Sequence, residues 1–353
     1  MAYTVIDKPS DYFNTKLYTG DGATDHAITG VGFQPDFCWF KNRTGVNYHN
    51  LFDSVRGVTL ALVTNTNAGN ETRANGLTVF GTDGFTLGGN DGNVNTSGQS
   101  YASWNWKAGT AFTNDASATG VGSIDSAGSV NTDAGFSIIR YGGTGSLGTV
   151  AHGLGVAPSF IAFKRLDTTG NWVNYHKSIG ATKYLRFDGT QAEITASDEF
   201  NDTEPTSTVF TVETDGAVNA SGTNNIIAYC FAEVKGYSKF GSYTGNNNAN
   251  GTFVYTGMKP AFVMIKNSTT APTSWVIQDT KRSSSSGGNP ADKRLLPNAT
   301  TAEATDSAID LLSNGFKIRS TGSWTNDSAN TYIYAAFAES PFTTSTGIPA
   351  TAR

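Results

Sequence analysis

One stretch of the chain decides the fold. It runs from Tyr141-Gly-Gly-Thr-Gly145 through Pro158 to Ser159-Phe-Ile-Ala-Phe-Lys164, with the proline 17 positions after the tyrosine and the lysine 6 after the proline. A tyrosine, a proline and a lysine recur with these two spacings at two other places. The anchors of the three copies are Tyr18, Pro35 and Lys41; Tyr141, Pro158 and Lys164; and Tyr243, Pro260 and Lys266. Two spacings kept in three places indicate a structural unit that is repeated along the chain.

Each copy has the pattern of short antiparallel strands. An apolar run with Phe37, Phe160 and Phe262 in register lies between proline and lysine, and it predicts a buried strand that opens just after the proline. Asp-Gly and Asn-Gly dipeptides between apolar runs predict hairpin turns. They stand at Asp83-Gly84, Asp215-Gly216 and Asn314-Gly315. Each copy closes on aromatic and small residues that are typical of a last packed strand, at 101–106, 226–231 and 332–337.

These patterns predict an all-β chain of three tandem antiparallel β-sandwich lobes of the jelly-roll or lectin-like kind. The segment 302–312 fits a helix or an edge strand equally well. The expected boundaries are an N-terminal arm at 1–12, repeat 1 at 13–109, an Ala/Ser/Thr/Gly linker at 110–120 that can also lend an edge strand, repeat 2 at 121–236, repeat 3 at 237–342 and a C-terminal tail at 343–353.

The composition favours a neutral polar surface. The 353 residues include 24 Lys and Arg against 29 Asp and Glu, which gives a net charge of −5, and 15% are charged. Ordinary globular chains carry about 25% charged residues. The acidic balance argues against a nucleic-acid partner. Apolar runs fall far short of the roughly 20 residues of a membrane span, and Cys38 and Cys230 are expected to be reduced core thiols.

Two motifs resemble ligand-binding loops. Gly143-Thr-Gly-Ser-Leu-Gly148 matches the dinucleotide fingerprint, but a second glycine-rich run follows where that fingerprint needs a helix, so a turn and no cofactor are expected. Asp91-Gly-Asn-Val-Asn95 starts like a calcium loop, yet Thr96 stands at the glycine position and no glutamate closes the loop. A solvated turn is the preferred interpretation there, and a structural Ca²⁺ is the alternative left open.

Side chains that could carry catalysis show no convergent pattern, so neither catalytic nor metal-binding residues are predicted. His49 and His176 align with each other after Tyr48 and Tyr175, and they are interpreted as strand histidines. The acidic residues of one segment of the second copy are expected to form a solvated loop. They are Asp198, Glu199, Asp202 and Glu204.

Two charged features recur and are interpreted as architecture. An aspartate and an arginine three positions apart, which can form a charge-assisted clip, occur at Asp53 and Arg56 and again at Asp279 and Arg282, whereas the second copy has His176-Lys-Ser-Ile179. Glutamates at similar distances past a leucine occur in all three copies, at Glu71, Glu193 and Glu303. Repetition in every copy favours a structural role over a single catalytic centre.

Aromatic residues divide into packing residues and one surface candidate. Trp172 and Trp275 align with each other and with Tyr48, and their recurrence favours core packing. Trp324, inside the polar run Gly322-Ser-Trp-Thr-Asn326, is the candidate for glycan contact.

Several runs resemble a known family. The runs 12–20, 32–37, 53–57 and 134–139, with His152-Gly-Leu-Gly-Val-Ala-Pro158, are similar to the repeat domain of uncharacterised virion proteins from marine tailed bacteriophages, and the C-terminal run 347–353 is similar to the end of such proteins. The similarity covers nearly the whole chain. It implies a structural component of a phage particle, of the tail-fibre or minor-structural type, and it implies no enzyme.

The expected function is therefore that of a non-catalytic virion protein on the surface of a phage particle. A tail-fibre or adhesin component that contacts host glycans is preferred. A head-decoration protein bound to the major capsid protein is the first alternative, and a carbohydrate-active enzyme is the second. The expected partners are other virion proteins, a host surface glycan and further copies of the same chain, with no nucleic acid, no membrane span and no cofactor.

Overall fold

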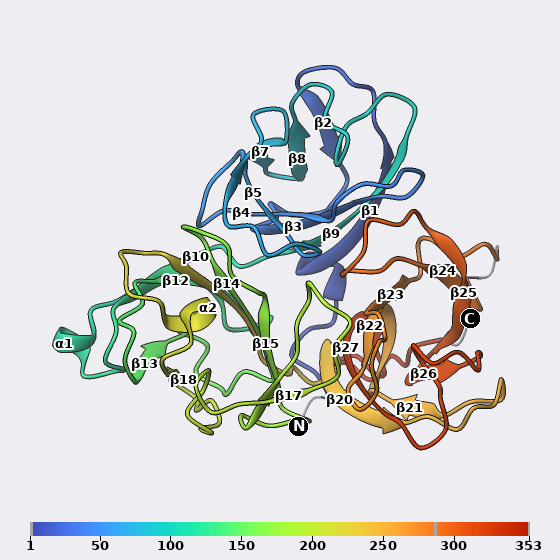
Figure 1. Ribbon diagram of the computed structural model, residues 1–353. Helices are drawn as coiled ribbons and strands as arrows, with labels where there is room; N and C mark the ends of the chain where they lie inside the picture. Colours follow the sequence, from blue (N-terminus) through green and yellow to red (C-terminus); the bar gives the residue numbers. More distant parts are fainter. Residues whose placement is uncertain (1–2, 286–287, 352–353) are drawn as a thin grey trace.

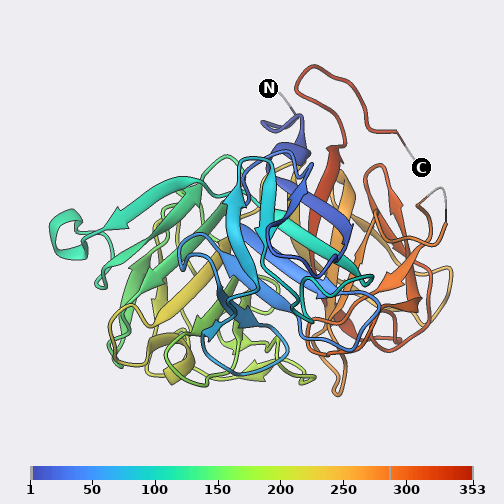
Figure 2. The ribbon, with the colours of Figure 1, turned by 90° about the horizontal axis from the view of Figure 1, so that it is seen from above.

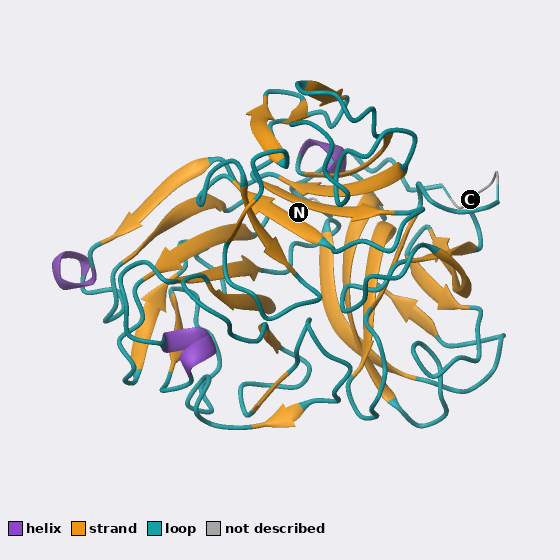
Figure 3. Ribbon diagram, turned by 45° about the horizontal axis from the view of Figure 1, so that its top comes forward, coloured by secondary structure: helices purple, strands orange, loops and turns teal. Residues whose placement is uncertain are grey.

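The computed structural model describes residues 3–285 and 288–351, and this part of the chain is all-β and antiparallel. Strands dominate, and helix is confined to three short turns: η1 (Pro9–Asp11), α1 (Ala116–Thr119) and α2 (Gly216–Asn219) (Figure 3). Within these described residues the strands form three groups, here called the first, second and third lobe, which meet at a common centre (Figure 1). The all-β sandwich class expected from the sequence is confirmed.

The first lobe pairs a large sheet with a small one. The large sheet has the order β1-β9-β3-β4-β5-β6 and the small one the order β2-β8-β7. The strands of the large sheet are β1 (Phe13–Thr19), β3 (Phe37–Asn42), β4 (Asn50–Asp53), β5 (Leu60–Val63), β6 (Glu71–Thr72) and β9 (Ser100–Trp106). Those of the small sheet are β2 (His26–Thr29), β7 (Leu77–Gly81) and β8 (Gly84–Leu87).

The second lobe repeats this order and extends it. Its large sheet has the order β10-β11-β12-β19-β14-β15, and β13-β18 and β16-β17 form two-stranded sheets. The large sheet consists of β10 (Thr110–Asn114), β11 (Ser126–Asn131), β12 (Phe136–Tyr141), β14 (Phe160–Arg165), β15 (Val173–His176) and β19 (Ile226–Phe231). The short pairs are β13 (Gly148–Ala151) with β18 (Val209–Val212), and β16 (Lys183–Tyr184) with β17 (Ile194–Thr195). Residues 110–120 thus hold β10 and α1, and β10 is the edge strand that their sequence allowed.

The third lobe has two four-stranded sheets, β20-β27-β22-β23 and β21-β26-β25-β24. The first consists of β20 (Ser238–Thr244), β22 (Met258–Asn267), β23 (Val276–Asp279) and β27 (Thr331–Pro341). The second consists of β21 (Phe253–Tyr255), β24 (Ala291–Arg294), β25 (Ala304–Leu312) and β26 (Gly315–Ile318). The segment 302–312 is therefore largely strand, because its apolar residues pair with β26 rather than lining one helical face.

Ladder registers fix which residues of the lobes correspond. Phe37, Phe160 and Phe262 face Trp106, Phe231 and Phe337 on the neighbouring strand. On the other side the same phenylalanines face Asp53, His176 and Asp279. The strand order β1-β9-β3-β4 of the first lobe thus matches β12-β19-β14-β15 and β20-β27-β22-β23.

The structure corrects two alignments and one hairpin prediction drawn from the sequence. His49, and not Tyr48, matches Trp172 and Trp275, because each directly precedes the first paired residue of its strand. His176 matches Asp53 and Asp279, as the spacing of the clips indicated, and does not match His49. Asp215-Gly216 is no hairpin, because Asp215 caps α2 by accepting a hydrogen bond from the amide of Ala217. Asp83-Gly84 and Asn314-Gly315 do join paired strands, β7 to β8 and β25 to β26.

The prolines stand where the buried central strands begin. β3 and β14 open two residues after Pro35 and Pro158, as expected. In the third lobe β22 begins earlier, at Met258, and the ladder shifts register at Pro260, because proline has no amide hydrogen to donate to the ladder. Three residues before each proline stands a glycine with positive φ, a conformation that side chains disfavour. These are Gly32, Gly155 and Gly257.

The lobes share one aromatic core. Phe37, Phe160 and Phe262 are all buried, and each contacts rings of another lobe. The ring of Phe37 lies 4.8 Å from that of Tyr229, and the ring of Phe262 lies 5.8 Å from that of Trp106. Separate apolar clusters fill the space between the sheets of each lobe. The large sheets therefore bury one face inside their own lobe and the other face against the neighbouring lobes.

The two ends of the described chain lie side by side. Near the N-terminus, Ile6 is buried in the shared core and Thr4 donates to the carbonyl of Lys235 between the second and third lobes. The amide of Ser345 donates to Asp7 at 2.6 Å, so the two end segments contact each other (Figure 2). Cys38 and Cys230 are buried free thiols, as expected. Among the described residues no helix has the length and apolarity that crossing a membrane requires.

Candidate functional site

The three anchor lysines are buried at the contacts between lobes. Lys41 donates to the carbonyls of Asn47 and Thr300, at 2.5 and 2.8 Å. Lys164 donates in the same way to Gly170 and Asn67, at 2.5 and 3.0 Å. Each ammonium therefore binds a loop of its own lobe and a loop of another. Burial lowers the pKa of Lys41 to about 7 and that of Lys164 to about 8.

The third lysine completes a ring of contacts. Lys266 donates to the carbonyl of Thr273 at 2.6 Å and to that of Thr190 at 3.4 Å, and burial lowers its pKa to about 7. The first lobe thus reaches the third, the second reaches the first and the third reaches the second. Backbone amides return the contact in each case. They are Glu303 to Arg43, Asn70 to Leu166 and Glu193 to Ser268.

These amides also correct the alignment of the glutamates. Glu193 and Glu303 are equivalent, and the first lobe has Asn70 at that position rather than Glu71. The side chains agree with this assignment, because Arg56 donates to the amide oxygen of Asn70 at 3.0 Å just as Arg282 donates to Glu303 at 3.1 Å. Glu71 instead pairs with Arg73 at 2.7 Å.

Two of the three contacts between lobes contain a buried ion pair. Arg56 binds Asp53 at 2.5 Å, and Asp53 also accepts from the hydroxyl of Tyr229 in the second lobe at 2.7 Å. Arg282 binds Asp279 at 2.6 Å. Trp104 of the first lobe donates its indole N–H to Asp279 at 2.9 Å. In each pair the aspartate therefore also accepts a hydrogen bond from an aromatic side chain of a neighbouring lobe.

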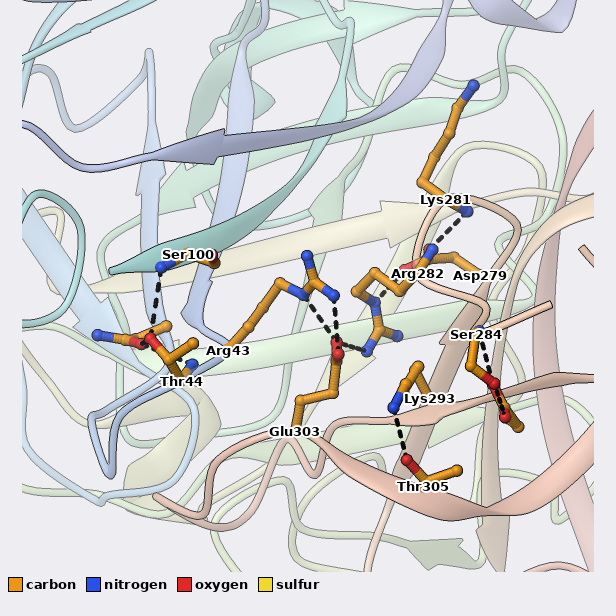
Figure 4. A network of polar contacts seen from close by, with 12 residues as sticks. Arg43, Thr44, Ser100, Asp279, Lys281, Arg282, Ser284, Lys293, Glu303 and Thr305 are labelled. Atoms are coloured by element: carbon orange, nitrogen blue, oxygen red, sulfur yellow. Dashed lines mark hydrogen bonds and ion pairs between the residues drawn. The ribbon is translucent and has the colours of Figure 1, made fainter. Parts of the chain in front are cut away.

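At the contact between the first and third lobes, Glu303 links the buried ion pair to a further arginine. Glu303 receives both Arg282 and the bidentate Arg43 of the first lobe, whose Nε and Nη2 lie 2.8 Å from its oxygens (Figure 4). A carboxylate shared by two guanidinium groups is a strong and geometrically specific joint.

The remaining contact, between the third and second lobes, has no ion pair at these equivalent positions, although Lys239 of the third lobe pairs with Glu233 at the end of the second. His176 stands at the aspartate position and Ile179 at the arginine position. His176 lies 3.1 Å from the carbonyl of Tyr334. The aromatic donor is missing too, because Ala335 matches Trp104 and Tyr229. Burial lowers the pKa of His176 to about 4, so its ring is neutral at pH 7.

The anchor tyrosines close the outer end of each lobe. Tyr18, Tyr141 and Tyr243 donate their hydroxyls to the carbonyls of Val94, Val218 and Thr325, at 2.8, 2.5 and 2.6 Å. In each case the next residue is a fully buried asparagine that bonds the glycine-rich turn. These are Asn95, Asn219 and Asn326. Sequence reasoning missed them, although Asp91-Gly-Asn-Val-Asn95 and Asp215-Gly-Ala-Val-Asn219 share a visible pattern.

The glycines of these turns are required by close packing. A Cβ on Gly143 would lie 2.1 Å from the carbonyl oxygen of Ala220, and one on Gly20 or Gly245 would lie 2.4 or 2.2 Å from the equivalent oxygen. The fingerprint-like run at 143–148 leads into β13, where a nucleotide site would need a helix. The calcium-like run at Asp91 forms a turn in which Asn95 and Val94 donate back to the Asp91 carbonyl.

The acidic segment of the second lobe is only partly solvated. Glu199 is buried, and burial together with Asp198 and Asp215 raises its pKa to about 8. Glu204 accepts hydrogen bonds from the Tyr175 hydroxyl and from the amide of Ala181. Among the described residues no group of three or more His, Cys, Asp or Glu is placed to hold a metal ion.

Trp324, the predicted glycan contact, lines an open groove at the outer end of the third lobe. Trp172 and Trp275 are buried, and their indoles donate to carbonyls of the neighbouring lobe, Val63 and Arg186. A fully apolar cavity at the centre of the molecule measures about 30 Å³, which is far below the roughly 300 Å³ of a small-molecule site. The buried anchor lysines, ion pairs and indoles thus hold the lobes together, whereas the groove at Trp324 lies at the outer end of one lobe.

Comparison with known proteins places the chain in a family without a defined role. The family described as a domain of unknown function, DUF7483, matches residues 8–341, and the chain belongs to it. No curated protein and no solved structure matches the chain.

Proposed function

We propose that this member of the DUF7483 family is a non-catalytic structural protein on the surface of a bacteriophage particle, a tail-fibre or adhesin-type component that contacts the host. The observation that carries the proposal is the use of the buried polar residues. Lys41, Lys164 and Lys266, and the two buried ion pairs, bind groups of neighbouring lobes. Polar chemistry in the interior therefore serves assembly rather than reaction.

The surface is consistent with that role. The chain combines 15% charged residues with many neutral Thr, Asn, Ser and Gly residues, and turns of this composition cover the outer ends of the lobes. An enzyme needs a convergent pocket with a positioned acid, base or nucleophile. The similarity of several runs to virion proteins of tailed phages supports the same assignment.

One observation favours head decoration as a second candidate. Each lobe contacts both others in a closed ring, so the molecule presents three related surfaces around its centre. Three related surfaces can contact three copies of the same partner, and a capsid shell presents many copies of one subunit. In that case the partner is the major capsid protein rather than a tail protein or a host glycan.

The test uses virions of the phage that encodes the chain. Heads and tails are separated, and the chain is quantified in each fraction by mass spectrometry. A few copies on tails support the tail assignment, and hundreds of copies on heads support decoration. Absence from both fractions would overturn the proposal.

A second measurement addresses catalysis. The purified chain is incubated with host envelope polysaccharide, and reducing sugar and acetate are measured. Release of either product that disappears when one carboxylate is replaced would make the chain an enzyme. The same preparation, examined by light scattering, tests the expectation that copies of the chain associate.

A further inference from the structure

The groove at Trp324 has the size and lining of a small-molecule site. Its volume is about 450 Å³, inside the range of roughly 300–1,000 Å³ that such sites occupy. Besides the indole it is lined by one carboxylate, one guanidinium and several hydroxyls. They belong to Asp306, Arg319, Ser307, Ser320 and Thr321. The groove thus places donors and acceptors beside an aromatic ring.

The indole is held in place before any ligand arrives. The guanidinium of Arg294, on β24, lies 4.4 Å from the centre of the Trp324 ring. Arg294 is itself paired with Asp306 on β25, and its side chain is only 12% exposed. A fixed aromatic ring loses little conformational entropy when a ligand binds.

The aromatic residue belongs to the third lobe alone among the three equivalent positions. The tyrosine contacts at Val94, Val218 and Thr325 align Trp324 with Asn93 and Ala217. The three lobes share the hydrogen bond from the tyrosine hydroxyl to this carbonyl, and they differ at the residue just before the carbonyl. Packing of the repeat therefore does not require the tryptophan.

The carboxylate of Asp306 lies at a bulge, which is a second feature that distinguishes the third lobe from the other two. The pairing of β24 with β25 shifts register beside Asp306, and Ser307 adopts a positive φ of 52°. The buried amide of Gln278 donates to the carbonyl of Ser307 and, at 3.0 Å, to that of Ala291. The equivalent residues of the other lobes are apolar or aromatic, Phe52 and Tyr175. Bulges of this kind re-aim side chains at binding sites.

The charges of the groove decide which ligand it fits. Arg294 is paired with Asp306 and Arg319 lies 3.4 Å from Asp310, so the cations and anions balance. Balanced charge gives a phosphate or another anion no net attraction. An aromatic face beside hydroxyl, carboxylate and guanidinium groups matches a ligand with apolar C–H faces and many hydroxyls.

The geometry points to a binding site for a neutral saccharide in this groove, with the sugar against Trp324 and its hydroxyls bonded by Asp306 and Arg319. The inference rests on the proposed function, because it names the part of the chain that would contact the host surface.

The test titrates the full chain with maltose, lactose and cellobiose and with an acid hydrolysate of host envelope polysaccharide, by calorimetry and by ligand-observed NMR. We expect at least one of these probes to bind. Trp324→Ala should weaken that binding at least 10-fold, Trp324→Phe should weaken it less, and Asp306→Asn should weaken it several-fold. Tyr48→Ala, which removes an aromatic ring that is 43% exposed on the first lobe, should leave it unchanged.

Two results would overturn the inference: no probe binds the unaltered chain, or Trp324→Ala and Trp324→Phe both bind as the unaltered chain does. Thermal melting of every variant shows that the fold is kept. Virion fractions probed for the chain separate this inference from the proposed function. If the chain is present on particles but binds no saccharide, the saccharide site is refuted and the proposed virion role stands. If the chain binds saccharide through Trp324 but is absent from particles, the virion role is refuted and the saccharide site stands.

Discussion

The contact between the first and second lobes and the contact between the third and second lobes occupy equivalent places but are built from different chemistry. In the former, Asp53 is bound by Arg56 and by the hydroxyl of Tyr229. In the latter, His176 lies 3.1 Å from the backbone carbonyl of Tyr334 and accepts from the amide of Ser178, and Ile179 replaces the arginine. The donor and the acceptor changed together, because Ala335 has no side chain that could reach an aspartate. Equivalent positions between lobes can therefore be occupied by an ion pair or by a neutral hydrogen-bonded side chain.

The largest expected effect separates the two contacts directly. Asp53→Ala leaves the Arg56 guanidinium buried without its anion, and it should lower the free energy of unfolding by about 3–5 kcal/mol. His176→Ala removes a neutral ring and should cost clearly less. Urea unfolding followed by tryptophan fluorescence measures both. Equal losses in the two variants would show that charge does not distinguish the contacts.

The contact at His176 should respond to mild acid. Burial lowers the pKa of His176 to about 4 from its usual 6.5, so the unfolded chain takes up a proton in a range where the folded chain does not. Stability therefore falls as the pH falls from about 6.5 to about 4, by about 3 kcal/mol for this group. His176→Gln should lose less stability than the parent between pH 7 and pH 4.5. An identical pH dependence in the two chains would contradict the assignment.

Rebuilding the pair at the contact of His176 sharpens the comparison. His176→Asp alone buries an unpaired carboxylate, whereas Ile179→Arg supplies its partner and places a guanidinium near Glu193, as Arg282 is placed near Glu303. A double-mutant cycle should give a favourable coupling of about 2 kcal/mol. The cycle is measured by urea unfolding of the two single variants and the double variant. Additive changes would mean that the backbone there does not reproduce the charged contacts.

The smallest expected effect isolates the aromatic donor. Tyr229→Phe keeps the ring and removes the hydroxyl that donates to Asp53, so it should cost about 1.5 kcal/mol, the lower end for a hydrogen bond to a charged group. Tyr237→Phe is the matched control, because the buried Tyr237 hydroxyl has no hydrogen-bond partner in the structure. A loss in the control as large as in Tyr229→Phe would assign the effect to packing.

The sequence by itself determined the repeated spacings, the all-β class and the buried central strands, which open just after the proline in the first two lobes but before it in the third. Fixed spacings and runs such as 160–164 are local signals, because strand formation and turn formation depend on neighbouring residues. Local signals also marked the tyrosines and glycines of the outer turns, but not the asparagines that they contact. Those side chains come together only when the chain folds back over some 75 positions, as between Tyr18 and Val94.

The tertiary structure alone decided what the anchors do. The sequence pattern places each anchor lysine in a strand. In the structure each lysine donates to a carbonyl of another lobe, and Lys41 and Thr300 are 259 positions apart. The alignments of His49, His176 and Glu71 failed for a related reason: counting residues cannot follow loops of unequal length, whereas ladder registers can. The spacing of Asp53 and Arg56 and of Asp279 and Arg282 did predict the two ion pairs, but not the donors Tyr229 and Trp104 that join them to other lobes. Those donors, and the separate departures that place Trp324, Arg294 and Asp306 around one groove, depend on packing between distant segments, which local sequence patterns do not record.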